Sequence, residues 1–191
     1  MKSLFLLLTT LLIYTSCKKD VSACKDYKEI TGQAHLIDLN TIEAPEFLDT
    51  LAKYPQLQAY RFDENSMTLA MNCHVFYKGL PLFSDYYYVL KDRSTNQIIT
   101  QDTIFKGPLN ISLEPAISYK DAIKYAKNIM NFDHTCISYR LGLYNINYGN
   151  TLNANYKLAW KVEGEKGFPF VIMDASTKRT FLASGGGFII D

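Results

Sequence analysis

The chain has 191 residues, of which 48% are hydrophobic, 14% aromatic and 20% charged. This composition is typical of a globular protein and excludes a disordered or fibrous one. The formal net charge of +1 gives no electrostatic reason to expect nucleic acid as a partner.

Residues 1–16 have the pattern of an export signal. Lys2 gives a positive start, Leu4–Ile13 is an apolar run too short to span a bilayer, and small residues lead up to Cys17. The segment resembles the signal of bacterial lipoproteins, which implies cleavage before Cys17 and its acylation, for example by palmitate. The alternative is an ordinary signal peptide followed by a chance cysteine. We therefore expect an exported protein that is lipid-anchored to the cell envelope, at the outer membrane. The sequence does not distinguish the periplasmic side from the cell surface.

Residues 17–28 are polar and charged and are predicted to form a tether after the anchor. With Cys17 acylated, three cysteines remain, Cys24, Cys73 and Cys136, so at most one intramolecular disulfide can form and its pairing stays open. Cys73 shares a strand face with apolar residues, so a buried thiol is as good an interpretation as a disulfide. A catalytic thiol is less favoured, because no histidine lies on that face.

Residues 29–108 are predicted to form the first domain, a helix followed by an antiparallel meander. Pro45 is placed to open the helix at its first position, and Pro55 ends it. The apolar and aromatic runs that follow are expected to be strands, with turns between them. They cover residues 57–62, 67–77, 83–90 and 98–105.

Residues 109–191 are predicted to form the second domain, after the break at Gly107-Pro108. Ser118 and Asp121 form a shortened capping box, and apolar residues at three- and four-residue steps predict a helix with one apolar face. A strand over 137–148, a hairpin and a glycine-containing terminal strand are expected to follow.

The predicted hairpin covers residues 156–181. Apolar and polar residues alternate in its first half, which indicates a strand with one face on the core and the other in water. Trp160 belongs to the core face. Lys157, Lys161 and Glu163 belong to the other face, and we expect them to be solvated and to carry no site chemistry.

Several motifs resemble known modules. The segments ISYKDAIKYAKN, YKLAWKVE and FVIMDASTKRTF resemble a PepSY domain, and HVFYKGLPLFSDYYYVLKD resembles the domain before it in propeptides of thermolysin-like metalloproteases (FTP plus PepSY). The resemblance implies an α+β fold of two small cystatin-like or PepSY-like units, each a helix packed on an antiparallel sheet. It also implies binding of a peptidase, although no HExxH zinc motif occurs in this chain.

The residues give little sign of catalysis or of a metal site. His35, His74 and His134 are scattered singly, so we expect surface or turn histidines, no metal and no cofactor. Asp174 ends an apolar strand and is interpreted as a turn-forming residue rather than a catalytic acid. We therefore expect a protein that is not an enzyme.

Two functional hypotheses follow. In the first, the chain is a non-enzymatic, lipid-anchored binding module, an inhibitor or chaperone of a secreted peptidase or a partner of another envelope protein. In the second, it is a small-ligand-binding or envelope-sensing lipoprotein. Under this second hypothesis, a pocket between the domains is lined by aromatic residues, namely Tyr86–Tyr88, Phe168 and Phe170.

Overall fold

The structure is a computed structural model that describes residues 27–29, 45–100, 108–132, 135–147 and 154–185. The predicted signal peptide, Cys17, Cys24, His35 and His134 lie outside these residues. In the described part of the chain, no helix is long and apolar enough to cross a membrane.

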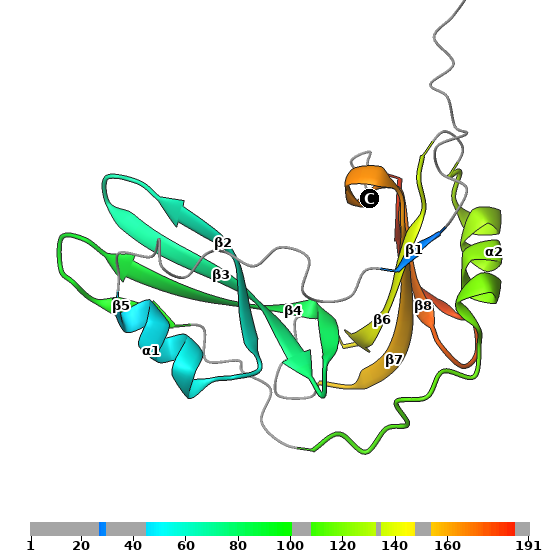
Figure 1. Cartoon of the computed structure of the whole chain (residues 1–191), viewed down its shortest axis with the longest axis horizontal. Coiled ribbons are helices and arrows are strands. Elements are labelled where there is room, and N and C mark those ends of the chain that lie inside the picture. Colours follow the sequence, from blue (N-terminus) through cyan, green and yellow to red (C-terminus); the bar gives the residue numbers. More distant parts are fainter. Residues whose placement is uncertain (1–26, 30–44, 101–107, 133–134, 148–153, 186–191) are drawn as a thin grey trace, which may run out of the picture.

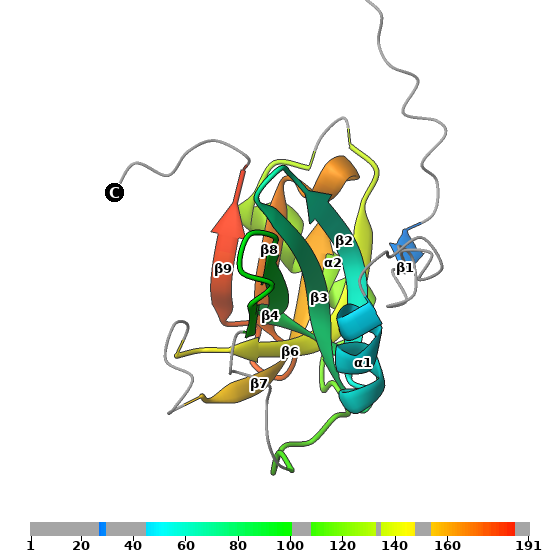
Figure 2. The ribbon, with the colours of Figure 1, turned by 90° about the vertical axis from the view of Figure 1, so that its left-hand side faces the viewer.

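The N-terminal half is the predicted helix followed by an antiparallel meander (Figure 1). The helix begins at Pro45 and has Lys53 in its last turn. It lies next to β2 (Figure 2), and its Phe47 is fully buried in the core. The elements of the N-terminal half are α1 (Pro45–Lys53), β2 (Leu57–Glu64), β3 (Thr68–Tyr77), β4 (Leu80–Asp92) and β5 (Ile98–Thr100). The helix and all four strands are confirmed in type, and residues 101–105 of the last one lie outside the described residues.

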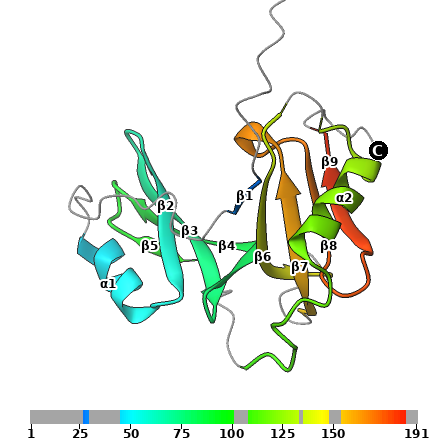
Figure 3. The same cartoon turned by 45° about the vertical axis from the view of Figure 1, so that its right-hand side comes forward.

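The C-terminal half is a second helix on a second set of antiparallel strands (Figure 3). Its elements are α2 (Tyr119–Ile129), β6 (Ser138–Asn145), β7 (Tyr156–Glu163), the 3-10 turn η3 (Glu165–Gly167), β8 (Phe170–Asp174) and β9 (Thr180–Ser184). The predicted N-cap of the helix is confirmed, because the backbone N–H of Asp121 donates to Ser118 Oγ at 3.2 Å. A short strand, β1 (Lys28–Glu29), pairs in parallel with β6, so the end of the predicted tether belongs to this sheet.

Trp160 lies in the core beneath α2, which confirms its predicted place on the core face. It is 7% exposed, and its indole Nε1 donates to the carbonyl of Ile117 at 2.8 Å. The ring of Tyr139 contacts it edge to face, and Ala122 and Ile123 of α2 are fully buried in the same cluster. This packing fixes the helix on one face of β7 and β8 and leaves the other face for a different set of contacts.

The two halves are joined more closely than two separate units would be. The described strands form one sheet in the order β2-β3-β4-β6-β7-β8-β9, with β4 and β6 parallel at Leu82 and Leu143. Buried side chains from both halves, Phe47 and Trp160 among them, belong to one core cluster. An α+β architecture with two helices on a large, mostly antiparallel sheet is therefore present, whereas the division into two cystatin-like units is not confirmed.

A glycine permits the junction between the halves. A Cβ added at Gly142 in β6 would lie 2.5 Å from Cζ of Phe83 and 2.5 Å from the carbonyl oxygen of Pro81. Any other residue would therefore push the start of β4 away from β6. The close approach brings Phe83 over the face of the C-terminal strands that α2 does not cover.

Candidate functional site

A cavity of about 480 Å³ lies where β3 and β4 of the N-terminal half meet β6–β9 of the other half. We name it the basic cavity. Its apolar lining consists of Pro81, Leu82, Phe83, Phe168, Phe170, Ile172 and Leu182. The other lining residues are His74, Ser84, Tyr86, Arg140, Tyr144, Lys161 and Gly167. Small-molecule sites have this size and this mixture of apolar walls with a few polar groups.

Two cations lie side by side in the wall of the cavity. Arg140 of β6 and Lys161 of β7 are directly opposite each other in the antiparallel ladder. The guanidinium of Arg140 lies 5.3 Å from the ring centre of Phe83, and Lys161 Nζ lies 5.4 Å from that of Phe170. An aromatic ring therefore lies against each cation, and both cations are partly buried.

The two cations differ in their ionic partners. Lys161 forms an ion pair with Glu163, two residues on in the same strand. Among the described residues, no carboxylate pairs with Arg140, and its Nε is buried without a hydrogen-bond partner. None of the described residues that line the cavity is acidic. Within the part of the chain that the structure describes, one positive charge at this site is thus left without a counter-charge.

The prediction that Lys161 and Glu163 face water was wrong. Their side chains are 17% and 7% exposed, respectively. The alternation along β7 correctly separates two faces, but the second face is covered by Phe83 and Phe170 instead of solvent. Lys157, near the start of the strand, is exposed as predicted.

His74 also departs from its prediction as a surface or turn histidine. It lies half-buried within β3. Its ring stacks on Tyr60 of β2 at a centroid distance of 4.0 Å and also contacts the ring of Tyr86 in β4. Burial, and then the charges of Arg140 and Lys161, lower the pKa of His74 to about 4. The imidazole is therefore neutral at pH 7.

Burial and the neighbouring guanidinium of Arg140 also lower the pKa of Lys161 from its usual value, while Glu163 opposes that shift. The direction of this shift agrees with the geometry: positive charge is already crowded at the basic cavity. An anion placed there would relieve the repulsion.

We expect acid to destabilise the folded protein through His74. The pKa of His74 is lower in the folded protein than in the unfolded chain, so between about pH 4 and pH 6.5 the unfolded chain binds more protons. The free energy of unfolding that this group contributes above about pH 6.5 is therefore lost as the pH falls toward 4. From about pH 7 to about pH 4.5 the wild type should lose about 1–2 kcal/mol more free energy of unfolding than His74→Phe, allowing for partial exposure. Urea unfolding at each pH measures this difference, and parallel pH profiles for the two proteins would contradict it.

The aromatic residues proposed from the sequence as pocket residues are largely brought together. Tyr86, Phe168 and Phe170 line the basic cavity. Tyr87 instead points into the core and is 2% exposed, and Tyr88 is 41% exposed and does not line the cavity. Arg140 was missed by the sequence analysis. The available signal was a cation inside a strand whose flanking residues are apolar.

The other candidate residues do not form a reactive centre. Cys73 is a free, buried thiol, as one interpretation of the sequence held, and burial raises its pKa to about 12. Cys136 is disulfide-bonded. Asp174 forms a turn, because its Oδ1 accepts from the backbone N–H groups of Ser176 at 2.7 Å and Thr177 at 2.9 Å. Within the described residues, no three metal-ligating side chains form a group.

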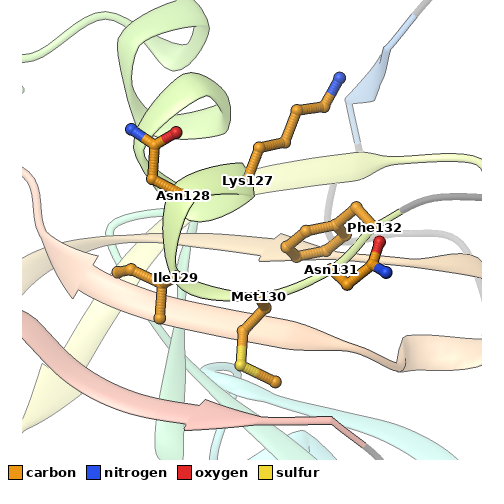
Figure 4. A pocket seen from close by; sticks show the side chains of 6 residues that line it. All are labelled: Lys127, Asn128, Ile129, Met130, Asn131 and Phe132. Carbon is orange, nitrogen blue, oxygen red and sulfur yellow. The ribbon is translucent and has the colours of Figure 1, made fainter.

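A second hollow, of about 350 Å³, lies at the C-terminal end of α2. Figure 4 shows that the side chains around it point in different directions: Lys127 and Asn128 extend away from Met130, and Phe132 lies beside Asn131. Because its polar groups do not converge on one point, this hollow offers no clear way to orient a ligand.

Comparisons with known proteins leave the family open. No protein family and no curated protein matches the chain. Among solved structures, the chain is similar to the Bacillus megaterium YpeB C-terminal domain, with 13% sequence identity and a TM-score of 0.46 over 81% of this chain and 68% of that chain. A likeness at this level supports no conclusion about function, and the resemblance to PepSY domains stays a prediction.

Proposed function

We propose that the protein binds a small organic molecule in the basic cavity. The observation that carries this proposal is the convergence of Arg140, Lys161 and His74 on one cavity whose remaining walls are aromatic and aliphatic. Such a combination orients a ligand by its polar end and holds it by its apolar body. The proposal favours the second of the two hypotheses drawn from the sequence.

We propose binding without catalysis. The thiol of Cys73 lies in the core, and its raised pKa keeps it protonated at neutral pH, so it cannot serve as a thiolate nucleophile. In the cavity, the hydroxyl of Ser84 donates to Asp85 and accepts from the backbone N–H of Asn145. Among the described residues, the hydrogen bonds of this hydroxyl are with Asp85 and Asn145 and not with His74, whose ring stacks on Tyr60.

The same proposal includes export and a lipid anchor on Cys17, which rest on the sequence of residues 1–17. A Cys17→Ser variant is then expected in the soluble fraction of the cells, whereas the wild type sediments with membranes. Equal membrane retention of the two proteins would count against the anchor.

A screen with a matched pair of variants tests the binding proposal. Leu182 lines the cavity and is 40% exposed, so Leu182→Trp should fill the cavity with little cost to the fold. Leu48 of α1 is 37% exposed and lies outside the cavity, so Leu48→Trp is the control. In ligand-observed NMR against neutral, cationic and anionic compounds, hits should bind wild type and the control and lose affinity for Leu182→Trp. A screen without hits, or hits unaffected by Leu182→Trp, would refute the proposal.

One observation favours a protein partner as a second candidate function. Ile98 and Ile99 of β5 are 43% and 49% exposed, and β5 lies outside the main path of the sheet, paired to β4. An apolar strand of this kind suits strand addition by a peptidase or another envelope protein. Pull-down from an envelope extract should then recover a stoichiometric partner that Ile99→Lys releases, and recovery of none would exclude this candidate.

A further inference from the structure

We infer that the ligand of the basic cavity is an organic monoanion, a carboxylate with an aromatic or alkyl body, whose charged group binds between Arg140 and Lys161. This inference rests on the proposed function and names the chemical class of its ligand. It follows from three observations: the charge balance, the place of the two cations in the ladder, and the chemistry of the walls.

The charge balance gives the sign and the number of charges on the ligand. Glu163 offsets Lys161, while in the described part of the chain no carboxylate offsets Arg140. His74 adds no charge at neutral pH. One net positive charge in a partly desolvated wall matches one negative charge on a ligand, because a dianion would bring a second, uncompensated charge into the cavity.

The place of the cations gives the reason for an anion between them. Like charges directly opposite each other on one face of an antiparallel pair destabilise a sheet. Arg140 and Lys161 occupy such positions, and aromatic rings limit the water that could screen them. A carboxylate between the two side chains converts this repulsion into two attractive contacts, and the planar guanidinium presents paired N–H donors to its two oxygens.

The walls give the character of the rest of the ligand. Phe83, Phe170, Ile172 and Leu182 surround the cations with apolar surface. The hydroxyl of Ser84 is already engaged by its neighbours in β4 and β6. An acidic sugar would leave most of its hydroxyl groups without partners at such walls, whereas a ring or an alkyl chain would bury its whole surface.

Matched acids and amides test the inference. Phenylacetate and hexanoate have the proposed charge, and phenylacetamide and hexanamide have the same shape without it. By calorimetric titration at neutral pH, at least one acid should bind wild type about tenfold or more tightly than its amide. Arg140→Met, which keeps an apolar stem, should remove this preference, while Arg179→Met, at an exposed position outside the cavity, should preserve it.

The outcomes separate this inference from the proposed function. If an amide binds as tightly as its acid, or if Arg140→Met retains the preference for the acid, the anion assignment is wrong while the cavity still binds a small molecule. Suppose that neither acid is preferred, but that neutral compounds from the screen bind wild type and lose affinity for Leu182→Trp. The inference about the anion then fails, while the proposed function stands. If no compound of any charge binds, both fail. Thermal unfolding of each variant checks that a loss of binding is not a loss of the fold.

Discussion

Lys161→Met is expected to lower the free energy of unfolding by about 3 kcal/mol. The substitution leaves the carboxylate of Glu163, whose side chain is 7% exposed, without its ionic partner. An unpaired buried charge costs more than the pair itself contributes. The repulsion between Lys161 and Arg140 is relieved at the same time, which keeps the expected loss at the lower end for a buried pair.

The matched control is the double substitution Lys161→Met with Glu163→Gln. Because no charge is then left alone, we expect most of the lost stability to return, and urea unfolding of the two single variants and the double variant measures the coupling. If Lys161→Met alone costs less than about 0.5 kcal/mol, the pair behaves as a surface ion pair, and the burial of this face is wrong.

Trp160→Ala is expected to be as costly or more so, with a loss of about 3–5 kcal/mol. The substitution opens a cavity beneath α2, removes the edge-to-face contact with Tyr139, and leaves the carbonyl of Ile117 without its indole donor. Chemical unfolding measures this loss in the free energy of unfolding. It is followed by circular dichroism, so that the signal does not depend on tryptophan.

Trp160→Phe separates packing from hydrogen bonding. It retains a ring but removes the indole N–H, so we expect a smaller loss of about 1–2 kcal/mol. Tyr88→Ala, at a ring that is 41% exposed, should stay within about 0.5 kcal/mol of wild type. A Trp160→Ala variant as stable as Tyr88→Ala would place the indole outside the core.

Local signals in the sequence were sufficient for the two helices and for the described strands other than β1. Pro45 and Ser118 begin the two helices because the chemistry of a helix start is decided within one turn. The alternation along 156–163 separated the face of Trp160 from the face of Lys161, since side chains alternate along a strand whatever its surroundings.

The environment of each face could not be read in the same way. Whether Lys161 meets water depends on Phe83, about eighty residues earlier in the chain, which reaches this face because Gly142 admits it. The register that places Arg140 opposite Lys161 is likewise a property of the folded sheet. The basic cavity is made of such distant contacts, so its aromatic residues could be suggested from the sequence while its cations could not be assigned.

The most direct test of the central claim is a crystal structure of the protein with the carboxylate that binds most tightly. We predict a carboxylate about 3 Å from the guanidinium nitrogens of Arg140 and from Lys161 Nζ, with the ring or chain of the ligand against Phe83 and Phe170. A carboxylate that points to solvent, or a ligand that occupies another place on the molecule while the basic cavity stays empty, would contradict the account.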